Sequence, residues 1–117
     1  MSQFEKIKIA IACCEALRAL QTKRIVHADL KPANLIINEK DGNYTIAIID
    51  YGFSKELLPG CDYIRARGLG APAYMAPEMK AHDPNARYSF ASDLYAFGVM
   101  FQRDLKLSTP LHFMTHF

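Results

Sequence analysis

Apolar residues recur with helical spacing at the start of the chain. Ser2 and Glu5 precede them with the S-x-x-E spacing of a capping box, which marks a helix N-terminus. One face would hold Phe4, Ile7, Ile11, Cys14 and Leu17, and Ile9, Cys13, Ala16 and Leu20 would widen it. So wide a stripe predicts a largely buried helix from about Gln3 to Gln21. Ile25-Val26 then reads as a short extended lead into a polar loop.

The pattern changes to two β-prone runs, Leu35 to Asn38 and Tyr44 to Ile49, around an Asp41-Gly42 pair. Asp-Gly between such runs is a strong hairpin signal. A two-residue turn would pair positions whose numbers sum to 83, and a longer loop would shift this by a residue or so. Asn34 would then lie opposite Ile49, next to Asp50.

The second half of the chain is less regular. Phe53 to Tyr74 shows no periodicity and contains several glycines, which predicts a long loop. From Ser92, an apolar run to Phe101 with a Ser/Asp start predicts a buried helix. Gln102 to Phe117 has no clear pattern. The sequence contains no linker or repeat, so its 117 residues indicate one small domain. The predicted helices and hairpin make this domain α+β in class, mainly helical.

Composition excludes several classes of protein. Half of the residues are apolar, and a net charge of +2 is too mild to favour nucleic acid as a partner. No run approaches the ~20 apolar residues of a membrane span, so we expect a soluble cytoplasmic protein without membrane contact. The three cysteines suggest neither a disulfide framework nor a zinc site. His112 and His116 are four apart, but no Glu or Cys nearby supports a metal site.

The stretch from His27 to Leu35 combines an acid, a base and an amide in a few residues. Pro32 fixes its own φ and disfavours helix at Lys31, which predicts a rigid loop. The hairpin would bring Asn34 close to Asp50. Two side chains that carry oxygen, at the open end of a hairpin, suit a hard cation such as Mg²⁺.

These motifs resemble those of protein kinases. The H-A-D-L-K-P-A-N run at 27–34 is similar to the catalytic loop H-R-D-x-x-x-x-N, and Asp50-Tyr51-Gly52 stands where kinases carry D-F-G. Residues 70–78 resemble G-T-P-x-Y-x-A-P-E, the end of the activation segment. The resemblance implies a partial kinase domain over 1–117, from the C-terminal lobe: helix 3–21, catalytic loop 27–34, hairpin 35–50 carrying the catalytic and metal-binding loops, activation segment 50–78 and a buried helix from about 92.

The resemblance also implies roles for single residues. Asp29 and Lys31 would be catalytic, with Lys31 typical of serine/threonine kinases. ATP would contact Lys31, Asn34 and Asp50, and Mg²⁺ would be held by Asn34 and Asp50. Glu78, Asp93 and His27 would be structural supports. The implied reaction transfers phosphate from ATP to Ser or Thr hydroxyls of a protein substrate.

The sequence also departs from the family pattern. No glycine-rich loop or strand lysine occurs, so we expect the N-terminal lobe to be absent unless a longer form supplies it. The alternative is a catalytically inactive truncated kinase or pseudokinase acting as a binding module, or an incomplete gene product without function. Ala28 and Ala71 replace the usual arginine and threonine, which predicts a kinase not switched by activation-segment phosphorylation.

Overall fold

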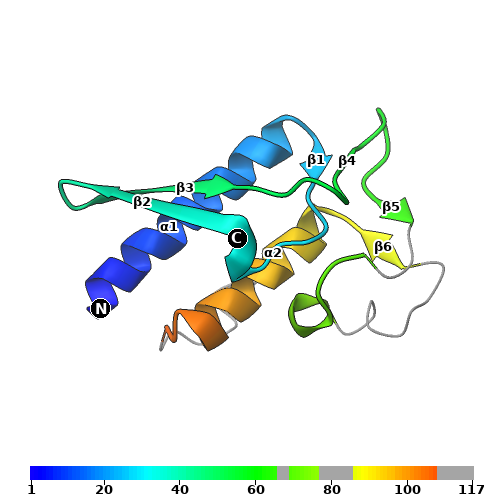
Figure 1. The fold of residues 1–117 in the computed structure, drawn as a ribbon. Coiled ribbons are helices and arrows are strands. Elements are labelled where there is room, and N and C mark those ends of the chain that lie inside the picture. Colours follow the sequence, from blue (N-terminus) through cyan, green and yellow to red (C-terminus); the bar gives the residue numbers. More distant parts are fainter. Residues whose placement is uncertain (66–68, 77–85, 108–117) are drawn as a thin grey trace.

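A computed structural model of the chain describes residues 1–65, 69–76 and 86–107. Its architecture is α+β, with two helices side by side in antiparallel directions and a hairpin over the first (Figure 1). The helical elements are α1 (Gln3–Thr22), η1 (Pro32–Asn34), η2 (Pro72–Tyr74), α2 (Phe90–Val99) and η4 (Met100–Asp104). The strands are β1 (Ile25–Val26), β2 (Leu35–Lys40), β3 (Asn43–Ile48), β4 (Lys55–Glu56), β5 (Ile64–Arg65) and β6 (Arg87–Tyr88).

Helix α1 begins where the capping box predicted and ends one residue later than expected. Ser2 Oγ accepts a hydrogen bond from the amide of Glu5 and donates one to its carboxylate, each at 3.1 Å. The expectation that this helix is largely buried was wrong. Phe4, Ile7 and Ile11 are 67%, 42% and 54% exposed, because β3 and α2 pack on the other side of the helix.

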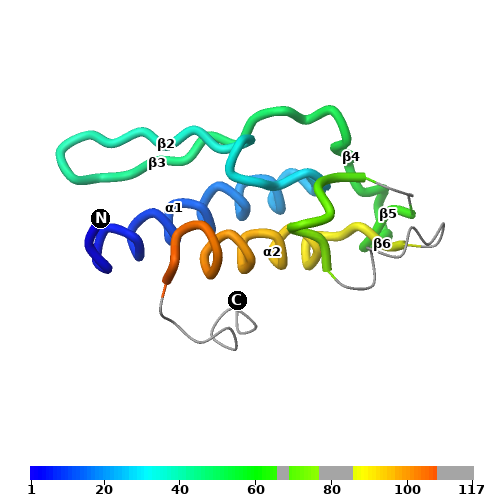
Figure 2. The backbone as a smooth tube through the Cα atoms, turned by 60° about the horizontal axis from the view of Figure 1, so that its bottom comes forward, coloured from blue at the N-terminus to red at the C-terminus, as the bar shows by residue number. Residues whose placement is uncertain are grey.

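The hairpin β2–β3 has the register that a two-residue turn predicted. Lys40 pairs with Asn43 and Leu35 with Ile48. Asp41 and Gly42 have φ angles of 54° and 79°, as a type I′ turn requires. The closed end of the hairpin lies beside the first half of α1, where Lys8 Nζ donates to the Gly42 carbonyl at 2.9 Å (Figure 2).

Helix α2 starts two residues before the predicted position. Its N-cap is Ser89, and Ser92 is the third helical residue, the partner of Ser89 in a capping box. The prediction took Ser92 for the cap because Phe90 and Ala91 lack a polar signal. The helix continues as the π-helical turn η4, and its buried face meets α1 and the hairpin in the main core: Ile9, Cys13, Leu17, Leu20, Leu30, Ile48, Ala96, Phe97, Met100 and Phe101.

The segment predicted as one long loop contains short strands. β4 pairs with β1, with Ile25 opposite Glu56, and β5 pairs with β6 at the end of the molecule away from the hairpin turn (Figures 1 and 2). Periodicity cannot reveal strands of two residues whose partners are distant in sequence. A second buried cluster lies under them: Val26, Ala28, Leu57, Met75, Ala76, Ala86 and Tyr88.

None of the described helices combines the length and apolar character that crossing a membrane requires.

Candidate functional site

The loop at residues 27–34 is held in place by hydrogen bonds to Asp93, a residue in the first turn of α2. Both carboxylate oxygens of Asp93 accept backbone hydrogen bonds, from His27 at 2.8 Å and from Ala28 at 3.0 Å. Burial raises the pKa of Asp93 to about 6, and the two amide donors oppose that rise. Ala28 has a φ of 71°, a left-handed conformation that an alanine adopts at a cost. This buried carboxylate therefore helps to hold the loop in a strained shape.

His27 connects the loop to the end of the hairpin. Its buried ring lies 2.9 Å from the Ile49 carbonyl through Nε2, and Nδ1 accepts from the Asp29 amide at 3.1 Å. One neutral tautomer, protonated at Nε2, satisfies both bonds. The ring also packs against the ring of Tyr51 in a T-shaped arrangement, with centroids 5.1 Å apart. His27 thus positions residues 29 and 49–51 relative to each other.

Asp29 and Asn34 are in direct contact. The Nδ2 of Asn34 donates to the Asp29 carbonyl at 2.7 Å and lies 3.4 Å from the Asp29 carboxylate. The turn η1 permits this because Pro32 takes its first position and the Asn34 amide donates to the Lys31 carbonyl at 2.9 Å. Asn34 is buried, whereas Asp29 is half-buried.

Asp50 lies two residues beyond Ile48, the last paired residue of β3. The Ile49 amide donates to the Asn34 carbonyl at 2.8 Å, which places Asp50 next to Asn34 in the chain path. Asp50 is exposed, with a φ of 60°, and its Oδ1 accepts from the Gly52 amide at 3.4 Å. It forms no hydrogen bond to Asp29 or Asn34. Lys31 is half-buried, and none of the described residues forms a hydrogen bond or ion pair with its side chain.

The donor set at this end of the hairpin fits a hard cation. Since Nδ2 of Asn34 is turned to Asp29, its Oδ1 is left as a ligand, and Asp50 offers Oδ2. Two oxygens from the protein suit Mg²⁺, which completes its shell with phosphate and water. Within the ranges that the structure describes, no group of three or more His, Cys, Asp or Glu side chains could hold a metal by itself.

Two residues that the sequence analysis did not single out support the loop from the other side. The hydroxyl of Tyr88, which is 2% exposed, accepts from the Leu69 amide and donates to the Leu69 carbonyl, both at 3.0 Å. Next to Leu69, Gly70 has a φ of +85°, and a Cβ there would overlap the Ala28 carbonyl oxygen. The glycines of 68–70 were visible in the sequence, but nothing local showed what they approach.

Some residues singled out from the sequence cannot be placed. Glu78, expected as a structural support, and His112 and His116 lie outside the described residues. Of the proposed site residues, the structure brings Asp29 and Asn34 into contact and puts Asp50 beside them in the chain path. The Lys31 side chain has no hydrogen-bond or ion-pair partner among the described residues.

The model of a family described as the protein kinase domain matches residues 1–115. Serine/threonine-protein kinase ATG1a of Arabidopsis thaliana is 37% identical over 87 residues, which are 74% of this chain and 13% of that protein. Dual specificity protein kinase shkB of Dictyostelium discoideum is 34% identical over 91 residues, 78% of this chain and 13% of that protein.

Serine/threonine-protein kinase 17A of Oryctolagus cuniculus is 34% identical over 86 residues, 74% of this chain and 20% of that protein. The chain therefore spans about an eighth to a fifth of the length of these relatives.

Proposed function

Because the chain belongs to the protein kinase family, we propose that it is part of the catalytic domain of a serine/threonine protein kinase. The reaction would transfer the terminal phosphoryl group of ATP to Ser or Thr hydroxyls of a protein substrate. In this proposal the chain is the first part of the C-terminal lobe, with the catalytic loop at 27–34 and an activation segment at 50–78. The names of the relatives support the serine/threonine class, although one is called dual specificity.

Asp29 accepts or orients the proton of the substrate hydroxyl. Asp29 is half-buried, and its backbone is held by His27 Nδ1 at the amide and by Asn34 Nδ2 at the carbonyl. A carboxylate on a backbone bonded at both ends has little freedom to leave its position. Such positioning is what phosphoryl transfer requires of a protein, since the reaction needs little covalent help.

Asn34 and Asp50 would hold Mg²⁺, and Lys31 would contact the phosphate. The cation supplies neutralisation of the charge that develops on the phosphoryl oxygens. The contact between Asn34 and Asp29 carries the proposal, because one amide side chain both holds the acidic residue and presents an oxygen ligand. The half-buried Lys31 side chain, without a partner among the described residues, is free to contact an anion.

The first experiment is denaturant unfolding of the chain with and without saturating Mg²⁺-ATP. A cooperative transition that moves to higher denaturant with nucleotide is expected for a working site. Asp50→Asn should abolish the shift, whereas Asp62→Asn, the same change at an exposed loop position, should retain it. A transition indifferent to nucleotide would favour a binding module without turnover.

Phosphoryl transfer itself is tested with Asp29→Asn, in this chain or in a longer protein that contains it. The variant should lose transfer to protein hydroxyls while its unfolding midpoint changes little, because the half-buried carboxylate makes only the weak 3.4 Å contact to Asn34. If transfer persisted at the unmodified rate, Asp29 would not have the proposed role.

A further inference from the structure

The exposed side of α1 carries a row of apolar side chains. Phe4, Ile7 and Ile11 are 67%, 42% and 54% exposed, and the half-buried Cys14 continues the row. Their alternating spacing of three and four residues places them along one line of the helix surface. Single apolar residues on a surface are ordinary, whereas a continuous row of them marks a contact surface. We call Phe4, Ile7, Ile11 and Cys14 the α1 stripe.

A groove of about 450 Å³ lies next to the α1 stripe, further along the helix. Its apolar lining comes from Ile11, Cys14 and Leu17 of α1 and from Leu94 of α2, and the exposed Arg18 and Gln21 also line it. Because Ile11 and Cys14 belong to the stripe as well as to the groove, the two features form one surface. The projecting part of this surface comes before Ile11 in the helix, and the hollow part comes after it.

We propose that this surface binds a second copy of the chain, with the two α1 helices antiparallel around a two-fold axis near Ile11. In that arrangement Phe4 and Ile7 of each copy enter the groove of the other. The contact is made twice, because a two-fold interface uses the same patch on both copies. Burial of these apolar side chains in the two grooves stabilises the pair. The inference does not depend on the proposed catalytic function.

The charges beside the α1 stripe favour the antiparallel direction. With the axis between residues 11 and 12, positions whose numbers sum to 23 face each other, so Lys8 of one copy lies opposite Glu15 of the other. Glu15 is exposed, and none of the described residues forms a hydrogen bond or ion pair with its side chain. Lys8 Nζ donates to the Gly42 carbonyl at 2.9 Å, which leaves its other N–H donors for a carboxylate. A parallel pair would instead set Lys8 against Lys8 and Glu15 against Glu15.

The test is the state of association of the full chain of 117 residues, measured by sedimentation velocity over a range of concentrations. We expect a monomer–dimer equilibrium without larger species, because a two-fold contact closes on itself. Ile11→Glu places two like charges at the axis and should raise the dimer dissociation constant by about 10- to 100-fold. Its unfolding midpoint, measured on the dilute monomer, should change little because position 11 is exposed.

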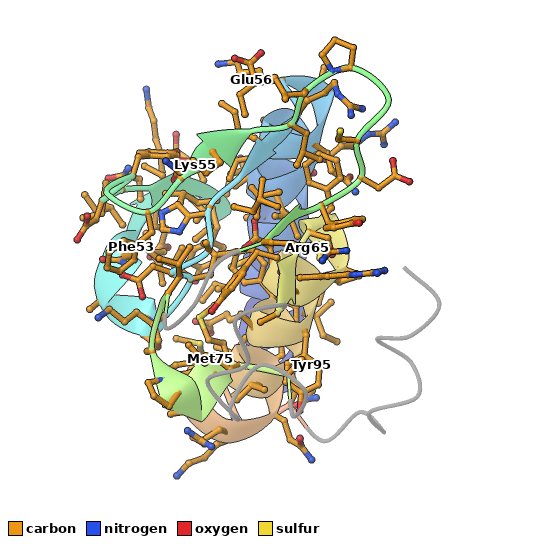
Figure 3. All side chains as sticks on the ribbon, turned by 90° about the vertical axis from the view of Figure 1, so that its right-hand side faces the viewer. Phe53, Lys55, Glu56, Arg65, Met75 and Tyr95 are labelled. Carbon is orange, nitrogen blue, oxygen red and sulfur yellow. The ribbon has the colours of Figure 1, made fainter. Side chains whose placement is uncertain are left out.

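Phe53→Glu is the matched control for Ile11→Glu. Phe53 is 43% exposed in the segment between β3 and β4 (Figure 3), and it belongs to neither the α1 stripe nor the groove. The same change from an apolar to an acidic side chain should therefore leave the dissociation constant as it is in the unmodified chain.

Charge reversal tests the direction of the pairing. Lys8→Glu and Glu15→Lys should each weaken self-association, because each variant sets like charges against each other. An equimolar mixture of the two variants should form mixed dimers, since every facing pair of charges between them is again opposite. The mixture should thus dimerise at a lower concentration than either variant alone.

Four results would overturn the proposal. A chain that stays monomeric at every concentration would mean that this surface is covered within one chain or by another partner. A series of larger species would mean non-specific aggregation. Equal effects of Ile11→Glu and Phe53→Glu would place the contact elsewhere, and a mixture no better than the single variants would exclude the antiparallel pairing.

Discussion

The carboxylate of Asp93 accepts a hydrogen bond of 2.8 Å from the backbone amide of His27, 66 residues earlier in the chain. The pair joins the first turn of α2 to the start of the loop that carries Asp29. Both residues are almost fully buried, so water competes little for this bond. The position of Asp29 therefore depends on a buried charge that Asp29 itself does not touch.

Asp93→Asn should change how stability depends on pH. Burial raises the pKa of Asp93 to about 6, whereas an unfolded aspartate titrates near 3.9. Between about pH 4 and pH 6, the native state therefore keeps Asp93 protonated whereas the unfolded state does not. The stabilisation that this proton gives the native state is complete below about pH 4 and is lost as the pH rises through about 6. The difference in unfolding free energy between the unmodified chain and Asp93→Asn should thus shrink by at most about 3 kcal/mol from pH 4 to 7.

Urea unfolding at intervals of half a pH unit measures this difference. Asp62→Asn, at an exposed position, is the control and should differ from the unmodified chain by a nearly constant amount. A gap for Asp93→Asn that stayed constant, or grew with pH, would contradict the elevated pKa.

Gly70→Ala should destabilise the fold more than Gly60→Ala. Both glycines have a positive φ, +85° and +80°, so each alanine pays about 1–2 kcal/mol for the left-handed backbone. A Cβ at position 60 meets nothing within 4 Å, whereas one at position 70 overlaps the carbonyl oxygen of Ala28. We expect Gly70→Ala to lose about 1–3 kcal/mol more in denaturant unfolding. Equal losses would mean that the contact with the loop is unimportant.

Tyr88→Phe removes a buried hydroxyl that bonds both backbone groups of Leu69. Because the Leu69 amide and carbonyl would lose their partner, we expect a loss of about 1–3 kcal/mol in unfolding free energy. Tyr44→Phe is the matched control, since that hydroxyl makes one exposed bond of 3.3 Å to Glu5 and its removal should change stability by less than about 0.5 kcal/mol. Similar effects of the two changes would show that the Tyr88 bonds add little.

The three cysteines should react with a thiol reagent in a fixed order. Cys61 is exposed, whereas burial raises the pKa of Cys13 to about 12 and raises that of the half-buried Cys14 less far. The thiolate is the reactive form, so at pH 8 Cys61 should be alkylated first and Cys13 only after unfolding. Cys61→Ser should remove the fast phase. Rapid labelling of Cys13 in the native chain would show that α1 opens readily.

Features that depend on neighbouring residues could be predicted from the sequence. The start of α1 follows from the bond between Ser2 and Glu5, and the hairpin register from the Asp41-Gly42 turn. Each of these rests on hydrogen bonds a few residues apart, so local chemistry is sufficient. The contact of Asn34 with Asp29 is also local, since the two residues are five positions apart around Pro32, but the sequence analysis did not predict it.

Long-range contacts were decided only by the tertiary structure. Which side of α1 is buried, the strands β4 to β6, the Tyr88 bonds to Leu69 and the approach of Gly70 to Ala28 all join segments far apart in the chain. The sequence determined the polar residues of the loop and the order of the motifs. It could not show which residues hold that loop in place. Those residues are distant in sequence, and the energy of such a long-range contact depends on how the intervening residues pack.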